Sequence, residues 1–307
     1  MTSDIAVIIN PAAGGGRGAV VWNTLKAKLN GRYDSVSTYF STKEEPIRQL
    51  SARVIAKEPD LLLIIGGDGT INQVINGLID SDKLCSPLTK LAIFNAGCGG
   101  DFLRQFSKTQ GDDLLEKLAS HSAQKVDVGK IEYGKHDCHY FINIASFGLS
   151  AKVAKQSSDS RFFKRLGGSI NYFIHALIGL MRHRNKKVLL SLNDKYRQEC
   201  NLTFAAICNG QYFGGGMHIA PQAKVDDILF DVIVFKDFNF LSVIFKLPLV
   251  YFGKHVKLKN VEQYQARSIE LFPKNNDYEV MIEADGECLG NLPAKVTLLD
   301  FQLDIVF

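Results

Sequence analysis

The feature that most constrains this chain is a buried strand that runs directly into a glycine turn and a helix, within residues 61–79. Leu61 to Ile65 is a short apolar run of the kind that a strand buried on both faces requires. It ends in Gly66-Gly67-Asp68-Gly69-Thr70, after which apolar residues recur with the helical period. Unpaired N–H groups at a helix start favour phosphate. The turn therefore predicts a phosphate site, with Asp68 as a partner for a metal ion or a hydroxyl.

Two more glycine turns follow strand-like runs in the first part of the chain. Ile5 to Ile9 leads into a loop over residues 10–18 and then a helix over Ala19 to Leu29. Leu91 to Phe94 leads into the glycine-rich segment 95–102. Strands that alternate with helices imply a parallel sheet covered on both faces, and ligands bind at the carboxyl ends of such strands. The three turns are therefore expected at one edge of the sheet.

The segment between these turns carries a helix-start signal. After a strand near Val36, Ser41 and Thr42 precede Glu44-Glu45, and hydroxyl side chains are good N-caps. This pattern predicts that the next helix begins directly after Thr42.

From about Lys125 the pattern changes to short alternating segments, which predicts an antiparallel β-sandwich. The expected strands are Asp127–Tyr133, His139–Ile144, Lys187–Leu192, Leu202–Cys208, Leu229–Val234, Arg267–Phe272, Val280–Ala284 and Lys295–Ile305. One apolar helical stretch, Arg161 to Arg184, either docks on a membrane or packs on the sandwich, and packing is the preferred interpretation. The expected domains are a three-layer α/β nucleotide-binding domain over 1–124 and a β-sandwich over 125–307, whose last strand is able to return to the first domain.

Composition sets few limits on function. The chain has 307 residues, a net charge of +4 and ordinary hydrophobic content, so attraction to anionic nucleotides or lipid headgroups is permitted but not established. Six cysteines without paired spacing predict reduced thiols and no zinc site. His136 to His139 is expected to form a solvated hairpin rather than a ligand cluster. Neither a signal peptide nor a membrane-spanning run is expected.

Further motifs accompany the glycine turns: Phe141-Ile142-Asn143-Ile144 before Phe147-Gly148, Asn209-Gly210, Gly214-Gly215-Gly216, Pro221 through Asp226-Asp227, and Ala284-Asp285-Gly286-Glu287. Together with Asn10-Pro11, residues 66–70 and residues 97–104, they make the chain resemble the diacylglycerol kinase-type catalytic domain family of bacterial lipid kinases and sphingosine kinases. The resemblance covers essentially the whole chain. The glycine-aspartate turn alone is shared with NAD kinases and phosphofructokinases. Its combination with the C-terminal Asp-Gly-Glu and with the segment from Pro221 to Asp227 is far more specific.

The resemblance implies a two-domain kinase that binds ATP and Mg²⁺ between its domains and phosphorylates a hydroxyl of diacylglycerol or a related lipid. The ATP-binding positions that it implies are Asn10, Gly15, Thr42, Gly66, Gly67, Gly69, Thr70, Gly97 and Asp101. Asp285 falls at the position of the general base, which suits a reaction that depends on alignment and charge neutralisation. From spacing alone, Asp-Gly indicates a solvated hairpin turn, and only the whole set of motifs favours catalysis.

The same resemblance assigns roles to other acidic residues. Glu287 and Asp68 join Asp285 in catalysis by organising magnesium and water, as do Asp101 and, as a further candidate, Asp127. A second, structural Mg²⁺ maps to the Asp227 carboxylate and the carbonyls of Lys224 and Leu229. Oxygen ligands of this kind suit a hard cation such as Mg²⁺.

Four positions depart from the family pattern. Cys98 and Gly100 replace a threonine and an asparagine, so weaker ATP binding is expected unless the glycines open the pocket for another nucleotide pose. Ile228 replaces a glycine, which weakens the case for the structural Mg²⁺. Ser150 replaces an aspartate of sphingosine kinases, which argues against a sphingoid base as substrate.

The expected function is thus an ATP-dependent lipid kinase, cytoplasmic and peripherally associated with a membrane. Its expected partners are a lipid substrate and, as one option, a second copy of the chain, but no nucleic acid. An NAD kinase-like enzyme, a non-catalytic nucleotide- or lipid-binding protein, and a scaffolding α/β protein are the alternatives. The identity of the lipid is not set by the sequence, because apolar residues that line acyl-chain pockets are interchangeable.

Overall fold

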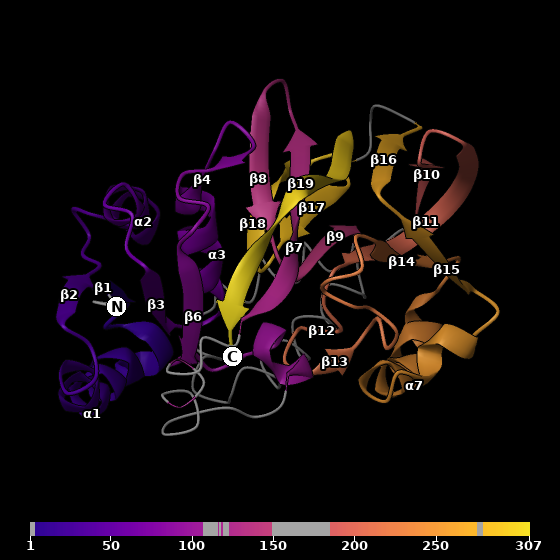
Figure 1. Cartoon of the computed structure of the whole chain (residues 1–307). Helices are drawn as coiled ribbons and strands as arrows, with labels where there is room; N and C mark the ends of the chain where they lie inside the picture. Colours follow the sequence, from indigo (N-terminus) through magenta and orange to yellow (C-terminus); the bar gives the residue numbers. More distant parts are fainter. Residues whose placement is uncertain (1–3, 107–115, 117, 119–122, 149–184, 275–278) are drawn as a thin grey trace. The chain divides into compact units, whose positions relative to one another are not determined.

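The computed structural model describes residues 4–106, 116, 118, 123–148, 185–274 and 279–307. It divides the chain into two compact units, residues 1–126 with 301–307 and residues 127–300. Two strands, β7 (Gln124–Tyr133) and β19 (Ala294–Val306), run from one unit into the other (Figure 1). The helix expected over Arg161 to Arg184, and Ser150, lie outside the described residues.

The first unit is built on a parallel sheet in the order β2-β1-β3-β6, which the last residues of β19 extend. Its strands are β1 (Asp4–Ile9), β2 (Ser35–Phe40), β3 (Leu61–Gly66) and β6 (Lys90–Asn95). The register sets Ile9 level with Phe40 and Ile65, and Ile65 level with Phe94. Because the strands end at the same level, the turns that follow them gather at one edge of the sheet, as the sequence predicts.

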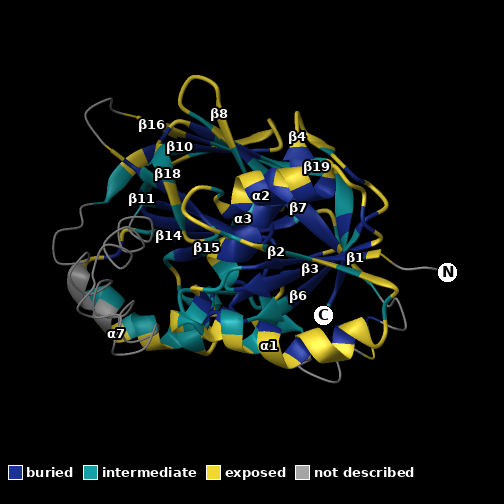
Figure 2. Ribbon diagram, turned by 90° about the vertical axis from the view of Figure 1, so that its left-hand side faces the viewer, coloured by how far each residue is buried: buried dark blue, intermediate teal, exposed yellow. Residues whose placement is uncertain are grey.

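Helices cover both faces of this sheet. Helix α1 (Arg17–Asn30) lies on one face, and α2 (Ile47–Ile55) and α3 (Asp68–Leu78) lie on the other (Figure 2). Trp22, Leu25 and Leu29 of α1 pack in one core with apolar residues of β1 and β3. The expected three-layer α/β arrangement is confirmed. The described part of the unit also has short elements: η1 (Ala13–Gly15), β4 (Ile79–Asp80), β5 (Lys83–Leu84) and η2 (Phe102–Gln105).

The second unit is antiparallel. Its strands are β8 (Asp137–Phe141), β9 (Ile144–Gly148), β10 (Lys186–Leu192), β11 (Tyr196–Cys208), β12 (Tyr212–Phe213), β13 (Met217–His218), β14 (Phe230–Lys236), β15 (Val261–Ala266), β16 (Ser268–Pro273), β17 (Met281–Ala284) and β18 (Glu287–Asn291), with parts of β7 and β19. Strand order runs β18-β17-β9-β11-β10-β16-β19, and β14 pairs with both β11 and β15.

Strand β11 shows how this unit buries two separate cores. Ala205 and Ile207 face one core, while Phe204, Ala206 and Cys208 face the other, as the alternation of a β-strand requires. The second core is closed by helix α7 (Phe240–Tyr251) and the loop that includes Ile219, and η4 (Lys254–Lys257) follows α7. The expected sandwich-like class is confirmed. Within the described residues no helix is long and apolar enough to cross a membrane.

Several local predictions were wrong. The expected strand His139–Ile144 is two strands, β8 and β9, separated by Ile142 and Asn143. Helix α7 and strands β15 and β18 were not predicted. The expected helix start after Thr42 is also wrong: α2 begins at Ile47 after Pro46, and the Thr42 hydroxyl instead accepts the N–H of Glu45 within a bend (3.1 Å). Helix α2 therefore begins without a side-chain cap, and Thr42 stabilises the preceding bend instead.

Candidate active site

The turn after β3 and the turn after β6 touch through their backbones. A Cβ at Gly67 would lie 2.9 Å from the Cα of Gly97, and a Cβ at Gly66 would lie 2.3 Å from the Thr70 side chain. Glycine at 66, 67 and 97 is therefore required by close approach. Gly69 differs, because it lies exposed in the first turn of α3, where helical backbone accepts any L residue.

Asn10 joins the loop after β1 to the turn after β3. Its amide Nδ2 donates to Thr70 Oγ1 (2.9 Å), and its Oδ1 accepts the N–H of Ala12 (3.1 Å). Both predicted nucleotide-binding side chains therefore hold the loops together. The groups that remain available to an anion in these loops are the backbone N–H groups.

The loop after β1 needs glycine for its conformation. Gly14, Gly15 and Gly16 have φ angles of 57°, 71° and 105°, a left-handed region that other residues rarely adopt. A Cβ at Gly14 would also lie 2.2 Å from the carbonyl oxygen of Ala96. Arg17 follows, and its Nη1 donates to the carbonyl of Gly97 (3.2 Å). This cation beside the phosphate-type turns was missed from the sequence, although an arginine after a glycine run was a visible signal.

Asp68 has one satisfied oxygen and one unsatisfied oxygen. Oδ2 accepts the N–H of Gly100 (2.8 Å), whereas Oδ1 is buried without a hydrogen-bond partner in the described part of the chain. Burial raises the pKa of this carboxyl, and hydrogen bonds from the N–H groups of residues 100–102 oppose the shift. A buried carboxylate oxygen without a partner is a ligand suited to a hard cation such as Mg²⁺. Asp101, also buried, lies 3.7 Å from the Arg104 guanidinium.

Gly100 is part of the structure of this loop. It has a φ of 67°, its N–H bonds Asp68, and a Cβ there would lie 2.3 Å from Asn95 Nδ2. Asn95 in turn accepts the N–H of Gly97 through Oδ1 (2.9 Å). An asparagine at position 100 would therefore do more than add a hydrogen-bonding group, because its Cβ would displace the Asn95 side chain. Cys98 is exposed.

In the second unit, the carboxylate of Asp285 accepts three backbone N–H groups. Oδ2 accepts Ile142 (3.0 Å), and Oδ1 accepts Asn143 (3.1 Å) and Ile144 (3.0 Å). Asp285 and Gly286, with φ angles of 48° and 91°, form the two-residue turn between β17 and β18, which pair at Ala284 and Glu287. The hairpin suggested by Asp-Gly is present, but its carboxylate is directed into the protein rather than left in solvent.

A second carboxylate, that of Glu283, stabilises this turn through a hydrogen bond to its backbone. Glu283 is buried, accepts the hydroxyl of Ser146 on the neighbouring strand β9, and accepts the N–H of Gly286. Burial raises its pKa to about 7, and the charges of Asp285 and Glu287 add to the effect while the two hydrogen bonds oppose it. Glu283 was not predicted as a site residue. Its position in β17, two residues before Asp285, was the available signal.

Two asparagines brace the backbone that holds Asp285. Asn209 donates from Nδ2 to the carbonyls of Ile142 (2.7 Å) and Asp127 (2.9 Å), and Asn143 donates to the carbonyl of Tyr212 (3.0 Å). Both belong to motifs quoted from the sequence, but their role as a frame for the 142–144 backbone depends on contacts between distant segments.

The turn expected to hold a structural cation has an unusual backbone. Ile228 adopts a φ of 60°, which is an outlier for a β-branched residue, so the turn keeps the conformation that glycine would favour. Its N–H donates to Asp127 (2.8 Å), and Asp227 accepts the N–H of Leu229 (3.1 Å). Lys224 is exposed in the same loop. Among the described residues, no group of three or more His, Cys, Asp or Glu side chains is arranged to hold a metal ion.

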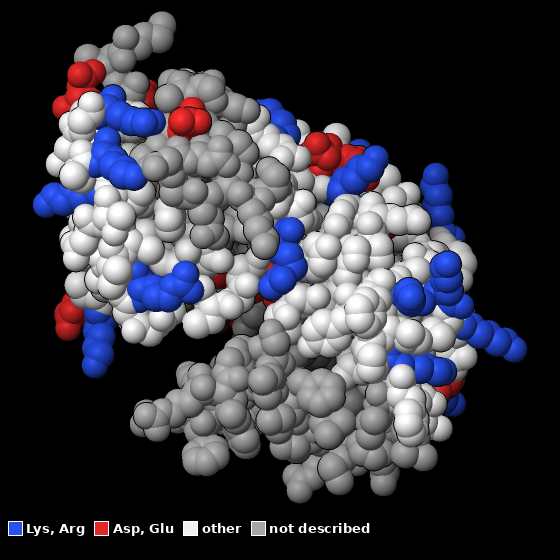
Figure 3. Space-filling view, turned by 90° about the horizontal axis from the view of Figure 1, so that it is seen from below, with Lys and Arg blue, Asp and Glu red and all other residues white. Residues whose placement is uncertain are grey.

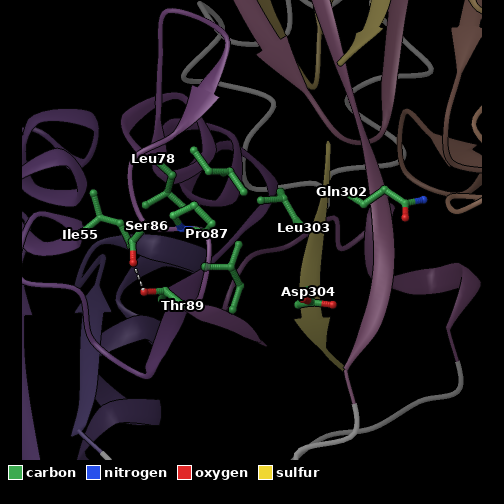
Figure 4. A pocket seen from close by; sticks show the side chains of 10 residues that line it. Ile55, Leu78, Ser86, Pro87, Thr89, Gln302, Leu303 and Asp304 are labelled. Carbon is green, nitrogen blue, oxygen red and sulfur yellow. Dashed lines mark hydrogen bonds between the residues drawn. The ribbon is translucent and has the colours of Figure 1, made fainter. Parts of the chain in front are cut away.

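A pocket in the first unit is too small for a nucleotide or a lipid. It is lined by Ile55, Leu78, Leu84, Ser86, Pro87, Thr89, Leu91, Gln302, Leu303 and Asp304, and its volume of about 10 Å³ holds roughly one water (Figure 4). Two of its polar lining residues, Ser86 and Thr89, bond each other at 2.8 Å. It is therefore excluded as a substrate site.

Comparison with known proteins identifies the family. Residues 4–131 match the diacylglycerol kinase catalytic domain, and residues 143–307 match the YegS C-terminal NAD kinase beta sandwich-like domain. The second match alone covers more than half of the chain. The chain belongs to the diacylglycerol kinase catalytic domain family that carries a YegS C-terminal domain. The resemblance inferred from the sequence is thereby confirmed.

Curated relatives of this family member span almost its whole length. "Putative lipid kinase YtlR" of Bacillus subtilis is 29% identical over 303 residues, covering 94% of each chain. "Diacylglycerol kinase" of Mycobacterium tuberculosis is 25% identical over 309 residues, covering 98% of this chain and 94% of its own. This member of the family is thus homologous to diacylglycerol kinases.

Solved structures share the fold. A diacylglycerol kinase from Bacillus anthracis gives a TM-score of 0.71 at 19% identity, covering 99% of this chain and 97% of its own. An NAD kinase from Archaeoglobus fulgidus in complex with ATP gives 0.53 at 13% identity, covering 99% and 93%. At these identities the likeness concerns the fold alone.

Proposed function

We propose that this family member is an ATP- and Mg²⁺-dependent lipid kinase that transfers the γ-phosphate to a hydroxyl of diacylglycerol or a related lipid, with Asp285 as the general base. The observation that carries the proposal is the orientation of the Asp285 carboxylate by three backbone N–H groups. An ordinary exposed hairpin aspartate would have no reason to be fixed in this way. The homology with diacylglycerol kinases supplies the reaction class.

The hydrogen bonds of Asp285 hold its carboxylate in one orientation. Oδ1 accepts two backbone N–H groups and Oδ2 accepts one. A carboxylate held in this way suits a general base, which must meet the lipid hydroxyl at a set position. As the hydroxyl proton moves to Asp285, the hydroxyl oxygen forms a bond to the γ-phosphorus of ATP, the bond to the β–γ bridging oxygen breaks, and ADP leaves. Glu287 would orient water or magnesium next to this base.

The glycine turns of the first unit would hold the nucleotide. The start of α3 offers unpaired N–H groups of Gly69 and Thr70 to phosphate, aided by the helix dipole. Further contacts of the nucleotide would come from Asn10, Gly15, Thr42, Gly66, Gly67, Gly97 and Asp101. Arg17, held beside Gly97, would add a positive charge toward phosphate.

Magnesium fits the first unit because Asp68 Oδ1 is a buried carboxylate oxygen without a partner in the described region. When bound, the ion would neutralise the phosphate charge that develops during transfer. A second Mg²⁺ would use the Asp227 carboxylate with the carbonyls of Lys224 and Leu229. The left-handed backbone of Ile228 keeps this turn in a conformation compatible with that role. The lipid substrate implies work at a membrane surface, and the proposal sets the protein in the cytoplasm.

The test is transfer of labelled phosphate from ATP to a panel of lipids in mixed micelles, with NAD as a separate acceptor. The proposal expects a labelled lipid with wild-type protein and a loss of label with Asp285→Asn. Labelled NAD would assign the protein to the NAD kinase class. Tight ATP binding without transfer to any acceptor would establish the non-catalytic binding protein instead.

A further inference from the structure

Helix α7 has one buried side and one exposed side. Val243, Leu247 and Val250 pack into or against the core of the second unit, and Asn239 caps the helix by accepting the N–H of Ser242 (2.8 Å). On the other side, Phe245 is 77% exposed and Phe252, at the C-cap, is 71% exposed, with exposed Pro248 between them. Spacings of three and seven residues place these three side chains on one face. Large aromatic side chains this far exposed are not explained by the fold.

Lysines adjoin this aromatic face. Between Phe240 and Val261 the sequence has four lysines and no Asp or Glu. Lys254, Lys257 and Lys259 are exposed, and within the described residues no carboxylate forms an ion pair with them. In Figure 3, which views the side on which α7 lies, uncharged surface is bordered by Lys and Arg side chains in this region.

The lysine segment is held firmly against the unit. Gly253 has a φ of 64°, and a Cβ there would lie 2.7 Å from Pro221. The next residue but one, His255, is buried and its Nε2 bonds the carbonyl of Ile219 (2.9 Å). The lysines are therefore presented beside the aromatic face by an anchored segment, so little ordering is needed on binding.

We infer that the face formed by Phe245, Pro248 and Phe252, with Lys254, Lys257 and Lys259, docks on an anionic lipid bilayer. Aromatic side chains suit the boundary between headgroups and acyl chains, and adjacent lysines suit anionic headgroups. A second copy of the chain fits less well, because a symmetric pair would bring the same lysines together. The inference rests on the proposed function, since a lipid kinase must reach a substrate held in a membrane.

The test is cosedimentation of the full chain with phosphatidylcholine vesicles, with and without phosphatidylglycerol, in the absence of ATP. We expect binding that requires phosphatidylglycerol. Phe245→Ser with Phe252→Ser should weaken it about tenfold or more, because burial of each aromatic side chain is lost. Lys254→Gln with Lys257→Gln should weaken it about fivefold per lysine. Leu88→Ser and Lys195→Gln, at other exposed positions, are the matched controls and should bind as wild type.

Kinase activity separates this inference from the proposed function. On a short-chain, water-soluble diacylglycerol, the Phe245→Ser, Phe252→Ser variant should keep wild-type turnover while losing turnover on vesicles. Vesicle binding that depends on the phenylalanines in a protein without kinase activity would leave the docking face correct and the kinase proposal wrong. Unchanged vesicle binding by both variants would overturn the docking face. If the Phe245→Ser, Phe252→Ser variant binds vesicles as wild type does but no longer forms a dimer that wild type forms in analytical ultracentrifugation, the face mediates self-association and the docking inference is wrong.

Discussion

Asp68 and Asp285 are two carboxylates on glycine-bearing turns, and they differ in how their oxygens are hydrogen-bonded. Asp68 Oδ1 is buried without a hydrogen-bond partner in the described structure, and burial raises the pKa of its carboxyl. Both residues are half-buried, but both oxygens of Asp285 accept backbone N–H groups. The Asp68 carboxylate thus has one oxygen without a hydrogen-bond partner, whereas backbone N–H groups hold both oxygens of Asp285 in place.

This difference separates two roles. A buried oxygen without a hydrogen-bond partner destabilises the folded protein, so a cation bound to Asp68 Oδ1 would lower the free energy of this site. The Asp285 carboxylate, whose two oxygens both accept backbone N–H groups, does not need a cation to satisfy a buried oxygen, and its fixed orientation suits proton acceptance. The comparison therefore supports the proposed division of roles, with charge neutralisation at the turn of the first unit and proton acceptance at the turn of the second.

The largest effect is expected for Asp285→Asn. Loss of a general base should lower turnover by about 10²–10⁴-fold, with ATP affinity retained because the nucleotide turns belong to the other unit. The new amide would face an N–H donor, so a stability loss of about 1 kcal/mol is also expected. Asp194→Asn is the matched control, an exposed aspartate with a φ of 58°. Near wild-type turnover of Asp285→Asn, measured on the best lipid, would remove this residue from the mechanism.

Gly69→Asp should weaken ATP binding by the first unit without destabilising the fold. A new negative charge beside the phosphates should weaken ATP binding by roughly tenfold to a hundredfold. The fold should not suffer, because an acidic residue in the first turn of a helix is favourable by about 0.3–1 kcal/mol. Calorimetry of ATP binding and thermal unfolding measure both quantities. Gly69→Asn supplies the same bulk without charge, and equal ATP affinity in the two variants would show that no phosphate lies there.

Glu283→Gln tests the support beneath Asp285. Because the folded-state pKa of Glu283 is raised from 4.5 to about 7, ionisation destabilises the fold as pH rises above 4.5, and the full penalty is present above pH 7. The glutamine avoids that penalty and still accepts the N–H of Gly286. We expect a stability gain of about 1–3 kcal/mol at pH 8 and little change at pH 4. Denaturant unfolding at both pH values checks it, and an equal change at each would contradict the buried-carboxyl account.

Gly100→Asn should produce a smaller effect on the first unit. Its Cβ would displace Asn95 and break the bond from Gly97, which contributes about 0.5–1.5 kcal/mol. We expect a loss of about 1 kcal/mol in the free energy of unfolding, together with weaker ATP binding. Cys98→Thr, two residues away and exposed, should change stability by less than about 0.5 kcal/mol. Tighter ATP binding by Gly100→Asn would restore the expectation drawn from the sequence.

Sequence reasoning found what is local and missed what is long-range. The continuous apolar run Leu61 to Ile65 predicts a strand buried on both faces, and the glycine turn that follows predicts an anion site at the sheet edge. The clash that a Cβ at position 100 would make depends on the side chain of Asn95, and the donors for Asp285 come from residues 142–144. No local pattern contains either contact. Helix α7 escaped prediction because its exposed face is also apolar, which removes the usual helical period.

The comparison of the two carboxylates is tested most directly by calorimetric ATP binding with and without Mg²⁺ in wild type, Asp68→Asn and Asp285→Asn. We expect Mg²⁺ to increase ATP affinity in wild type and in Asp285→Asn, and most of that increase, about tenfold, to vanish in Asp68→Asn. Asp68→Asn should also unfold at a higher temperature without ligand, because it removes a buried charge. A Mg²⁺-dependent increase that survives in Asp68→Asn, or that disappears in Asp285→Asn, would contradict the assignment of the two roles.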